Sequence, residues 1–531
     1  MIETRRSRRW PLALVTCALC AACAGGTSKS TPTADVSAGW TMFHADETHT
    51  GFAHGKGKID STAGPRSISE FRVFGALAGA DAGLLRWTST FALGDVNGDG
   101  ADDIVVTTPD WAAPLTPTID GQPLTDGLSV LTYRDGGLTQ LWRWTSDLPP
   151  GEAGLDTYSP ALVDADGDGL VDVVFTARDG FVRALNGRTG DLIWDFDMGR
   201  ITEAGPMLSD LDGDGVPEVI VVTDCKQGPR CIGTDGPARM LVLSARGSGR
   251  VVSPLWETSF AYKMDSAEPA VAVVDGIGSP GDKVVLLGTW GGEMLAVWRE
   301  SASGEVKSSS FELTSLLTEV ASANPPVIRS SPLVWNGPDG PEVFFGWLPS
   351  DEDAADARFT ALRLSAVDGQ VVFNAAFTID RYDIWKSSPA LVPGGDHAPL
   401  IVAGYGLGIG PNPTQSGPVG LCVAEFISGG VVAVSPQGDE IWRVDYNGAE
   451  GNLRASAAIA DIDGDGRLEV VLPSGCFGRL HVFDALTGDE EWSLDLGPVT
   501  QTSPSLGDVD GDGYLDIVLG SYDGLVRVLT G

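Results

Sequence analysis

One nine-residue acidic pattern occurs five times in the sequence. It reads Asp-x-Asp/Asn-x-Asp-Gly-x-x-Asp/Glu, and its copies begin at Asp95, Asp164, Asp210, Asp461 and Asp508. Alternate carboxylates on a tight loop provide the hard oxygen ligands that suit Ca²⁺, and the glycine at the sixth position permits the sharp turn. A single copy could be a solvated acidic turn, because Asp and Gly are common in turns. Five copies with one spacing favour metal binding.

The residues that follow each copy predict a β-strand. Asp103–Thr108, Asp172–Thr176 and Glu469–Leu472 are β-branched or apolar runs, which are typical of strands. An EF-hand calcium loop is instead flanked by helices. The acidic loops are therefore predicted to lie inside β-hairpins.

The strong negative charge of the chain bears on how it folds and on which partners it can bind. The net charge is −37, and without metal each acidic loop holds like charges close together. Folding is therefore expected to depend on calcium. The same charge argues against nucleic acid as a partner, because its phosphates would be repelled.

The acidic loop belongs to a longer repeat. In residues 159–197 the pattern predicts four strands, with a hairpin turn at Asp179-Gly180. The predicted strands are Ala161–Val163, Asp172–Ala177, Phe181–Leu185 and Leu192–Phe196. Together they form one four-stranded antiparallel blade.

Eight such units predict an all-β fold, an eight-bladed β-propeller. Three middle units have the first-strand pattern at Pro269, Ser331 and Ser388 but no intact acidic loop, and no metal is expected there. The last unit, Ser503–Gly531, supplies three strands, so we expect Ile68–Gly75 to add the fourth and close the ring. The alternative is seven blades plus an extra N-terminal piece.

The loop with its following strand resembles the FG-GAP or VCBS repeat, the unit of integrin α-chain propellers. The resemblance covers residues 91–531. It implies about five structural Ca²⁺ sites, each with side-chain ligands from positions one, three, five and nine and a backbone carbonyl from position seven. By loop, the implied ligands are Asp95, Asn97, Asp99, Ala101 and Asp103; Asp164, Asp166, Asp168, Leu170 and Asp172; Asp210, Asp212, Asp214, Val216 and Glu218; Asp461, Asp463, Asp465, Arg467 and Glu469; Asp508, Asp510, Asp512, Tyr514 and Asp516.

A second resemblance concerns tryptophans. Residues 184–194 and 483–492 resemble the tryptophan-docking motif of quinoprotein propellers, and Trp142, Trp256 and Trp442 lie at similar points. That likeness would imply a PQQ dehydrogenase. The interpretation favoured by the residues themselves is that each Trp packs its blade on the next.

The N-terminus reads as an export signal. Residues 1–23 combine four arginines with a short apolar stretch and end in Cys20-Ala-Ala-Cys23, which resembles a bacterial lipobox with Cys23 as the lipidated residue. Plain cleavage after Ala22 or Ala24 is the alternative. Residues 24–38 read as a flexible tether, and residues 39–90 as an N-terminal segment that includes the closing strand.

The remaining cysteines fit two disulfides in an exported protein, although some could be free. Cys225 and Cys231 lie six residues apart in one loop, and Cys422 and Cys476 lie in neighbouring repeats. The lipobox and the residues after it favour an outer-membrane lipoprotein or a cell-surface location, with a secreted or periplasmic protein as the alternative. Membrane contact is then expected only through the lipid.

Long insertions fall between the second and third strands of several units, on the face opposite the acidic loops. They are residues 109–127, 224–239, 348–358 and 404–429, with Trp111, Tyr405 and Phe426 as possible contact aromatics. Loops on a rigid scaffold are common recognition sites. No GxSxG, HExxH or P-loop pattern occurs in the sequence, and His49 and His54 are expected on a surface segment.

The leading hypothesis is a non-enzymatic, monomeric, calcium-stabilised propeller that binds a protein or a glycan through the insertion face. One alternative is an enzyme resembling the polysaccharide lyases built on calcium-loaded propellers. The other is a scaffold resembling the outer-membrane-assembly lipoprotein.

Overall fold

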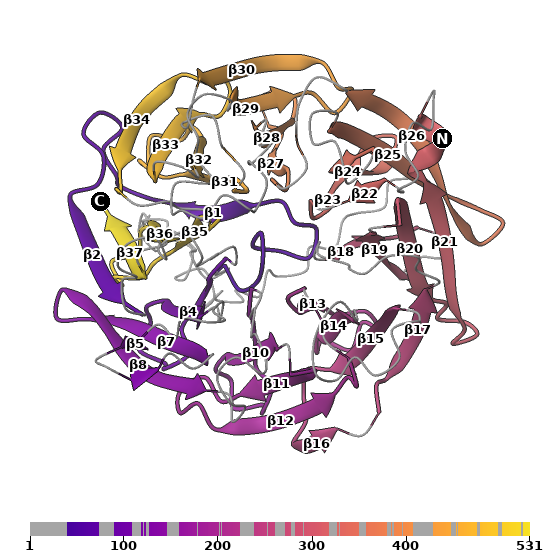
Figure 1. The fold of residues 1–531 in the computed structure, drawn as a ribbon, viewed down its shortest axis with the longest axis horizontal. Coiled ribbons are helices and arrows are strands. Elements are labelled where there is room, and N and C mark those ends of the chain that lie inside the picture. Colours follow the sequence, from indigo (N-terminus) through magenta and orange to yellow (C-terminus); the bar gives the residue numbers. More distant parts are fainter. Residues whose placement is uncertain are drawn as a thin grey trace, which may run out of the picture. The chain divides into compact units, whose positions relative to one another are not determined.

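Eight antiparallel sheets surround a common axis in the computed structural model of the chain (Figure 1). The structure describes residues 40–531 except 74–89, 109–117, 120–121, 124–126, 146–158, 178, 201, 203, 224–237, 252, 261–270, 278–281, 290, 318–325, 329, 350–356, 380–383, 385–386, 396, 407–427, 448–452, 454, 475–477, 498–501 and 522–523. Contacts divide the chain into residues 1–33 and 34–531, and the description concerns the second unit alone.

Each sheet is one blade whose strands follow one another in sequence from the ring centre outward. Blades 1 to 4 comprise β3 (Ala92–Gly94), β4 (Asp103–Thr108), β7 (Gly127–Arg134) and β8 (Gly137–Thr145); β9 (Ala161–Val163), β10 (Asp172–Thr176), β11 (Phe181–Leu185) and β12 (Leu192–Asp197); β13 (Met207–Ser209), β14 (Glu218–Thr223), β15 (Ala238–Ser244) and β17 (Trp256–Phe260); β18 (Ala272–Asp275), β19 (Lys283–Gly288), β20 (Glu293–Arg299) and β21 (Val306–Glu312).

Blades 5 to 8 repeat the plan, with the last strand of blade 8 drawn from the N-terminal segment. They comprise β23 (Leu333–Gly337), β24 (Gly340–Leu348), β25 (Arg358–Val367) and β26 (Gln370–Ile379); β27 (Ala390–Val392), β28 (Leu400–Gly406), β29 (Ser428–Val434) and β30 (Glu440–Asn447); β31 (Ala458–Asp461), β32 (Glu469–Pro473), β33 (Arg479–Asp484) and β34 (Glu490–Asp495); β35 (Ser505–Gly507), β36 (Asp516–Gly520), β37 (Leu525–Thr530) and β2 (Ser67–Arg72).

A few short elements lie outside this plan. β16 (Gly249–Val251) pairs in parallel with the outer strand of blade 2, β22 (Val327–Ile328) pairs with β24, and β5 (Thr118–Ile119) pairs with β6 (Gln122–Pro123). The 3-10 helix η2 (Leu313–Leu316) follows β21. Among the described residues, no helix is long and apolar enough to cross a membrane.

The ring closes as predicted, by a strand from the N-terminal segment. β2 pairs antiparallel with β37 along its whole length, from Ser67 opposite Thr530 to Arg72 opposite Leu525. The guanidinium of Arg527 donates to the Glu70 carboxylate at 2.8 Å across this pair. The eight-bladed prediction is confirmed, and the seven-bladed alternative is excluded.

The N-terminal residues also form a feature that the sequence did not predict, which we call the belt (Trp40–Lys58). The belt runs through the middle of the ring, drawn in indigo in Figure 1, and includes β1 (Phe52–Lys56), which pairs in parallel with β31. In six blades the amide of the second inner-strand residue donates to a belt carbonyl over 2.7–2.9 Å. These pairs are Leu93 to Trp40, Leu162 to Thr41, Val273 to Glu47, Val334 to Thr48, Leu391 to Thr50 and Ile459 to Gly51.

Tryptophans on the outer strands of blades 1, 2 and 6 bond to the next blade. The indole N–H donates to a carbonyl in the turn between the third and fourth strands of the next blade, from Trp142 to Gly187 (2.7 Å), Trp194 to Ala245 (2.7 Å) and Trp442 to Ala485 (2.9 Å). This arrangement is the packing role favoured by the sequence, and it buries the side chain of Trp194 completely.

Seryl side chains connect the blades near the start of their inner strands. The Ser388, Ser456 and Ser503 hydroxyls accept the amides of Ser331, Ser388 and Ser456, each at 2.9 Å. Thr90 donates its hydroxyl to Ser159 at 2.7 Å. Each bond therefore satisfies a buried backbone or hydroxyl group of one blade with a side chain of the next.

Candidate metal centres

The five acidic loops lie on five consecutive blades. Each connects the inner strand of its blade to the second strand, as the sequence predicted. They are loop 1 (Asp95–Asp103) on blade 1, loop 2 (Asp164–Asp172) on blade 2, loop 3 (Asp210–Glu218) on blade 3, loop 4 (Asp461–Glu469) on blade 7 and loop 5 (Asp508–Asp516) on blade 8. Because blade 8 adjoins blade 1, the loops form one arc from blade 7 to blade 3.

The first carboxylate of each loop accepts hydrogen bonds from the turn that follows it. The amide of the position-four glycine donates to Asp95, Asp164, Asp210 and Asp461 over 2.6–2.8 Å. The glycines at positions four and six have positive φ in all five loops, for example 81° at Gly98 and 91° at Gly100. Glycine is the residue that reaches this conformation without steric cost, so these positions set the curvature of the loop.

The carboxylate at position nine forms the floor of each loop. It is buried in all five loops, at Asp103, Asp172, Glu218, Glu469 and Asp516. Each accepts the amide of the position-two residue over 2.8–3.1 Å, which folds the loop back onto the start of the second strand.

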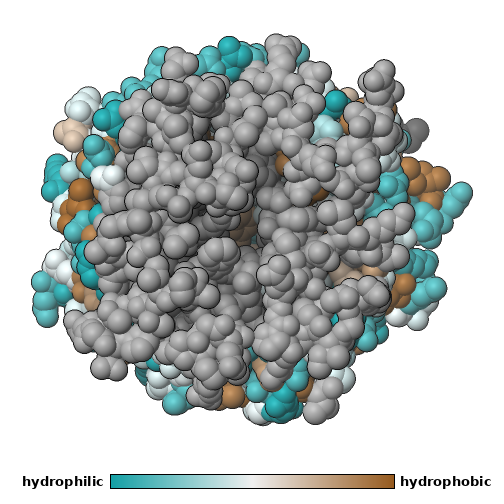
Figure 2. Space-filling view, in the orientation of Figure 1, coloured by the Kyte–Doolittle hydropathy of each residue, from teal (hydrophilic) through white to brown (hydrophobic). Residues whose placement is uncertain are grey.

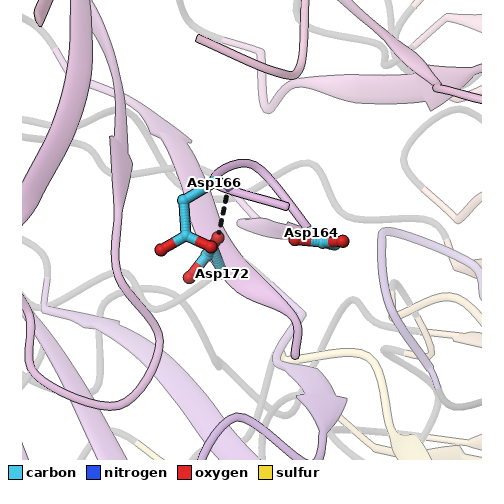
Figure 3. Close-up of side chains that lie close together, drawn as sticks. All are labelled: Asp164, Asp166 and Asp172. Carbon is cyan, nitrogen blue, oxygen red and sulfur yellow. Dashed lines mark hydrogen bonds between the residues drawn. The ribbon is translucent and has the colours of Figure 1, made fainter. Parts of the chain in front are cut away.

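Four loops bring carboxylates together closely enough to share an ion. The grouped residues are Asp164, Asp166 and Asp172; Asp210, Asp212 and Glu218; Asp461, Asp463 and Asp465; and Asp508, Asp510 and Asp516, with ligand atoms within 4.8 Å of one another in each group. Figure 3 shows the group of loop 2, where Asp166 and Asp172 lie beside one another and Asp164 lies across the turn from them. The Asp166 amide donates to the Asp172 carboxylate at 3.2 Å.

Not every implied ligand lies in these groups. Asp168 and Asp214, at position five, are exposed and accept the amide at position seven instead. In loop 1, Asn97 donates its side-chain amide to Asp103 at 2.8 Å. The position-seven residues Ala101, Leu170, Val216, Arg467 and Tyr514 are half-buried or exposed.

Without a bound cation, burial disfavours the ionised form of the position-nine carboxylates. It raises the pKa of Asp103 to about 6, of Glu218 to about 7, of Asp516 to about 8 and of Glu469 to about 9. The Glu469 Oε1 atom is buried and has no hydrogen-bond partner in the described part of the chain. All the donors are oxygens, the ligand type preferred by hard divalent cations. The acidic groups therefore fit a metal ion of this class.

In the three other blades, the position equivalent to position nine holds an apolar residue or an acid paired with arginine. The pair Val163–Asp172 of blade 2 corresponds in register to Val274–Val284 in blade 4 and Val392–Leu400 in blade 6, where the partner is buried and apolar. In blade 5 the corresponding residue is Glu342, whose carboxylate accepts Nε of Arg363 at 2.8 Å. There an arginine provides the positive charge.

Two residues near the loops were missed by the sequence analysis. Asp102 Oδ2 accepts the amide of Asp508 at 3.0 Å, and the Asp102 amide donates to the Asp508 carbonyl at 2.8 Å, so this residue joins loop 1 to loop 5. Position eight is apolar in the other four loops, and this contrast could have identified Asp102. Lys58 forms an ion pair with Asp512 of loop 5, and no local signal pointed to it.

The structure contradicts two predictions about exposed side chains. His49 is fully buried in the belt, so its expected surface position is wrong, whereas His54 is exposed. Tyr405 is 9% exposed and donates its hydroxyl to Asp445, so it packs within blade 6 and offers little contact surface. The belt lacks any local sequence signal that separates it from a surface loop.

Other predictions lie outside the described residues. These are the signal and tether with Cys23, the four cysteines Cys225, Cys231, Cys422 and Cys476, most of the four insertions, and the aromatics Trp111 and Phe426. The described strand ends that flank the insertions lie at the edge opposite the acidic loops, as in the pair Gly406–Gly429. At the rim of the ring, the described surface is mostly hydrophilic with interspersed hydrophobic side chains (Figure 2).

Comparison with known families identifies FG-GAP repeats in the chain. The FG-GAP repeat model matches residues 87–122 and 500–529, which include loops 1 and 5. No curated protein sequence matches the chain.

Solved structures share the fold at low sequence identity. A quinohemoprotein alcohol dehydrogenase from Pseudomonas putida HK5 is 12% identical with a TM-score of 0.55, and the match covers 94% of this chain and 81% of that one. A europium-containing methanol dehydrogenase is 11% identical with a TM-score of 0.53, over 91% and 89% of the two chains. Sqt1 of Saccharomyces cerevisiae is 10% identical with a TM-score of 0.50, over 88% and 98%. These similarities support the β-propeller fold and carry no activity over to this chain.

Proposed function

We propose that this FG-GAP-containing propeller is a calcium-stabilised binding protein that recognises a protein or a glycan through the face opposite its acidic loops. The observation that carries the proposal is the group of carboxylates within 4.8 Å in loops 2, 3, 4 and 5. Like charges held this closely repel one another, and a divalent cation offsets the repulsion. With loop 1, which has Asn97 at position three, the proposal counts about five Ca²⁺ sites.

In this proposal calcium has a structural role. The ion would be held by the side chains at positions one, three, five and nine and the backbone carbonyl at position seven. It would join the inner strand of a blade to its second strand. It would supply positive charge beside the buried position-nine carboxylate. The chain's own residues supply the rigid scaffold, and the insertions between second and third strands supply recognition.

The first test is the calcium content of the purified protein. Equilibrium dialysis against Ca²⁺ should give about five bound ions per chain, and thermal unfolding should move to a lower temperature when a chelator is added. A protein that binds no Ca²⁺ under these conditions would contradict the proposal.

The second test concerns the recognition face. Residues 24–531 would be immobilised and exposed to cell-envelope and extracellular extracts, with Ca²⁺ and with chelator. A matched variant would replace residues 407–427 by a short turn, which the ladder permits because Gly406 and Gly429 already pair. A partner captured by the chain and lost in the variant supports recognition through this face. Equal capture by both places recognition elsewhere.

We propose further that the chain is exported and attached to the outer membrane through Cys23. Incorporation of labelled palmitate into the chain, and its loss in Cys23→Ala, would test the attachment. Protease treatment of whole cells would distinguish a surface-exposed propeller from one that faces the periplasm.

A further inference from the structure

The end of the belt passes between two acidic loops. The Gly57 amide donates to the Asp461 carbonyl of loop 4 at 2.7 Å, and the Ile59 amide donates to the Ile462 carbonyl at 3.0 Å. A Cβ atom on Gly57 would lie 2.2 Å from the Ile462 oxygen, so the belt lies directly on loop 4 with no room for a side chain.

The same belt residues contact loop 5 on their other side. The amide of Leu515, at position eight of loop 5, donates to the Lys56 carbonyl at 3.1 Å. The Lys58 ammonium group pairs with Asp512 and lies 5.2 Å from the centre of the Tyr514 ring. Residues 56–59 are thus held between positions one and two of loop 4 and positions five to eight of loop 5.

Loop 5, on blade 8, also contacts the neighbouring blade 1. Asp102 of loop 1 exchanges two hydrogen bonds with the backbone of Asp508, the first residue of loop 5. Ser505, just before loop 5, donates its hydroxyl to the Phe91 carbonyl at 2.8 Å. The backbone of loop 5 is therefore in contact with both the belt and blade 1.

We infer that loop 5 is a calcium-dependent latch whose occupied form holds the belt in the ring and blade 8 against blade 1. This inference rests on the proposed calcium binding and gives loop 5 a role at the place where the belt, blade 8 and blade 1 meet. Asp508 supplies both a clustered carboxylate and the backbone contacts to Asp102, so ordering of the loop by an ion also orders those contacts. Loop 3 has the corresponding carboxylate group, yet its blade lies away from the contact between blades 8 and 1.

Two matched substitutions test the latch. Asp510→Asn in loop 5 and Asp212→Asn in loop 3 both change position three, and in each loop that carboxylate accepts the position-five amide, at 3.2 Å and 3.1 Å. Hydrogen–deuterium exchange of the full chain in Ca²⁺ would report on residues 40–58 and on β2. In Asp510→Asn, exchange of the belt should become faster by about tenfold or more, whereas in Asp212→Asn it should stay at the wild-type rate.

A second variant probes the contact without touching a carboxylate. Gly57→Ala places a methyl group against the Ile462 carbonyl and should speed exchange of the belt while loops 1 to 3 keep wild-type protection. It remains informative if Asp510→Asn folds poorly, because all five acidic loops keep their carboxylates.

The outcomes separate this inference from the proposed function. If Asp510→Asn and Asp212→Asn both affect only their own loops, or both release the belt equally, the latch is overturned while calcium binding stands. If the wild-type chain binds no Ca²⁺ in equilibrium dialysis, the proposed function and the latch both fail. Selective release of the belt in Asp510→Asn supports the latch.

Discussion

At the scale of single residues, the position-nine carboxylates show how a metal requirement is built into a strand. Each is the first residue of the second strand of its blade and is buried against the loop in front of it. A buried carboxylate is costly without compensating charge. At the equivalent position, blade 5 has Glu342, whose charge is offset by Arg363. Blades 4 and 6 have buried apolar residues there and so carry no charge.

The substitution Glu469→Gln tests this requirement. Removing the charge should lower the affinity of loop 4 for Ca²⁺, and a site saturated a hundredfold above its Kd contributes about 2.7 kcal/mol to the free energy of unfolding. The difference in stability between Ca²⁺ and chelator should therefore shrink by up to about this amount. In chelator the variant should be at least as stable as the wild type, because the buried acid is gone. The measurement is urea unfolding in both conditions, with the exposed Glu305→Gln as control. An unchanged calcium effect would contradict the assignment.

The contact between Trp442 and Gly488 is a second prediction at this scale. Gly488 has a φ of 74°, and a Cβ atom there would lie 2.5 Å from the Trp442 ring. Gly488→Ala should therefore reduce the free energy of unfolding by about 1–3 kcal/mol beyond the loss caused by the positive φ angle alone. Gly497→Ala is the matched control, since Gly497 has a φ of 84° and open space around it. Equal losses in the two variants would exclude the ring contact as the cause.

At the scale of elements, the belt has buried histidines and left-handed backbone angles that local sequence patterns do not predict. Its histidines His44 and His49 are fully buried and adopt positive φ angles of 54° and 58°. Nδ1 of His49 contacts the Pro332 carbonyl at 3.1 Å, although the two residues are far apart in sequence. Burial lowers the pKa of both histidines to about 3.

These histidines predict a pH dependence. In the unfolded chain a histidine takes up a proton below about pH 6.5, but in the folded belt it does so only near pH 3. The stabilising effect of the neutral rings is complete above pH 6.5 and is lost as the pH falls toward 3, by at most about 1.4 kcal/mol per pH unit for each group. His49→Gln should unfold with a shallower dependence on pH between 6.5 and 4. Urea titrations at several pH values compare the two proteins, and identical slopes would show that His49 does not control the dependence.

The strands and acidic loops were predictable because their signals are local. Alternation of Asp and Gly fixes a loop, and β-branched runs such as Asp172–Thr176 fix a strand within a residue of its observed end. The closing strand was also predictable, because the last repeat has three strands and needs a fourth. The belt was not predictable in this way, because its position depends on contacts between residues hundreds of positions apart. The local pattern marks Asp102 as a carboxylate at a position that is apolar in the other four loops, but it does not show the bonds of Asp102 to Asp508.

At the scale of the whole molecule, the N-terminal segment completes the ring twice, as the belt inside it and as β2 outside blade 8. A chain that begins at residue 74 should lose both and expose the edge of β37 and the inner strand edges. We expect it to aggregate or to unfold without a single cooperative transition, whereas a chain that begins at residue 40 should behave like the full protein. Size-exclusion chromatography and thermal unfolding distinguish the two results. A cooperative monomer starting at residue 74 would show that the segment is dispensable.

The closure of the ring also has a consequence for biosynthesis. The residues that hold the belt and β2 in place include Leu515 and Leu525–Thr530 of blade 8, which a ribosome adds only after the other seven blades. Until they emerge, the belt and β2 have incomplete partners and the ring remains open. Contacts over such separations form slowly, because the intervening chain must lose much of its freedom first. The protein therefore passes through its most vulnerable stage just before blade 8 forms, when the other seven blades exist and the ring is still open.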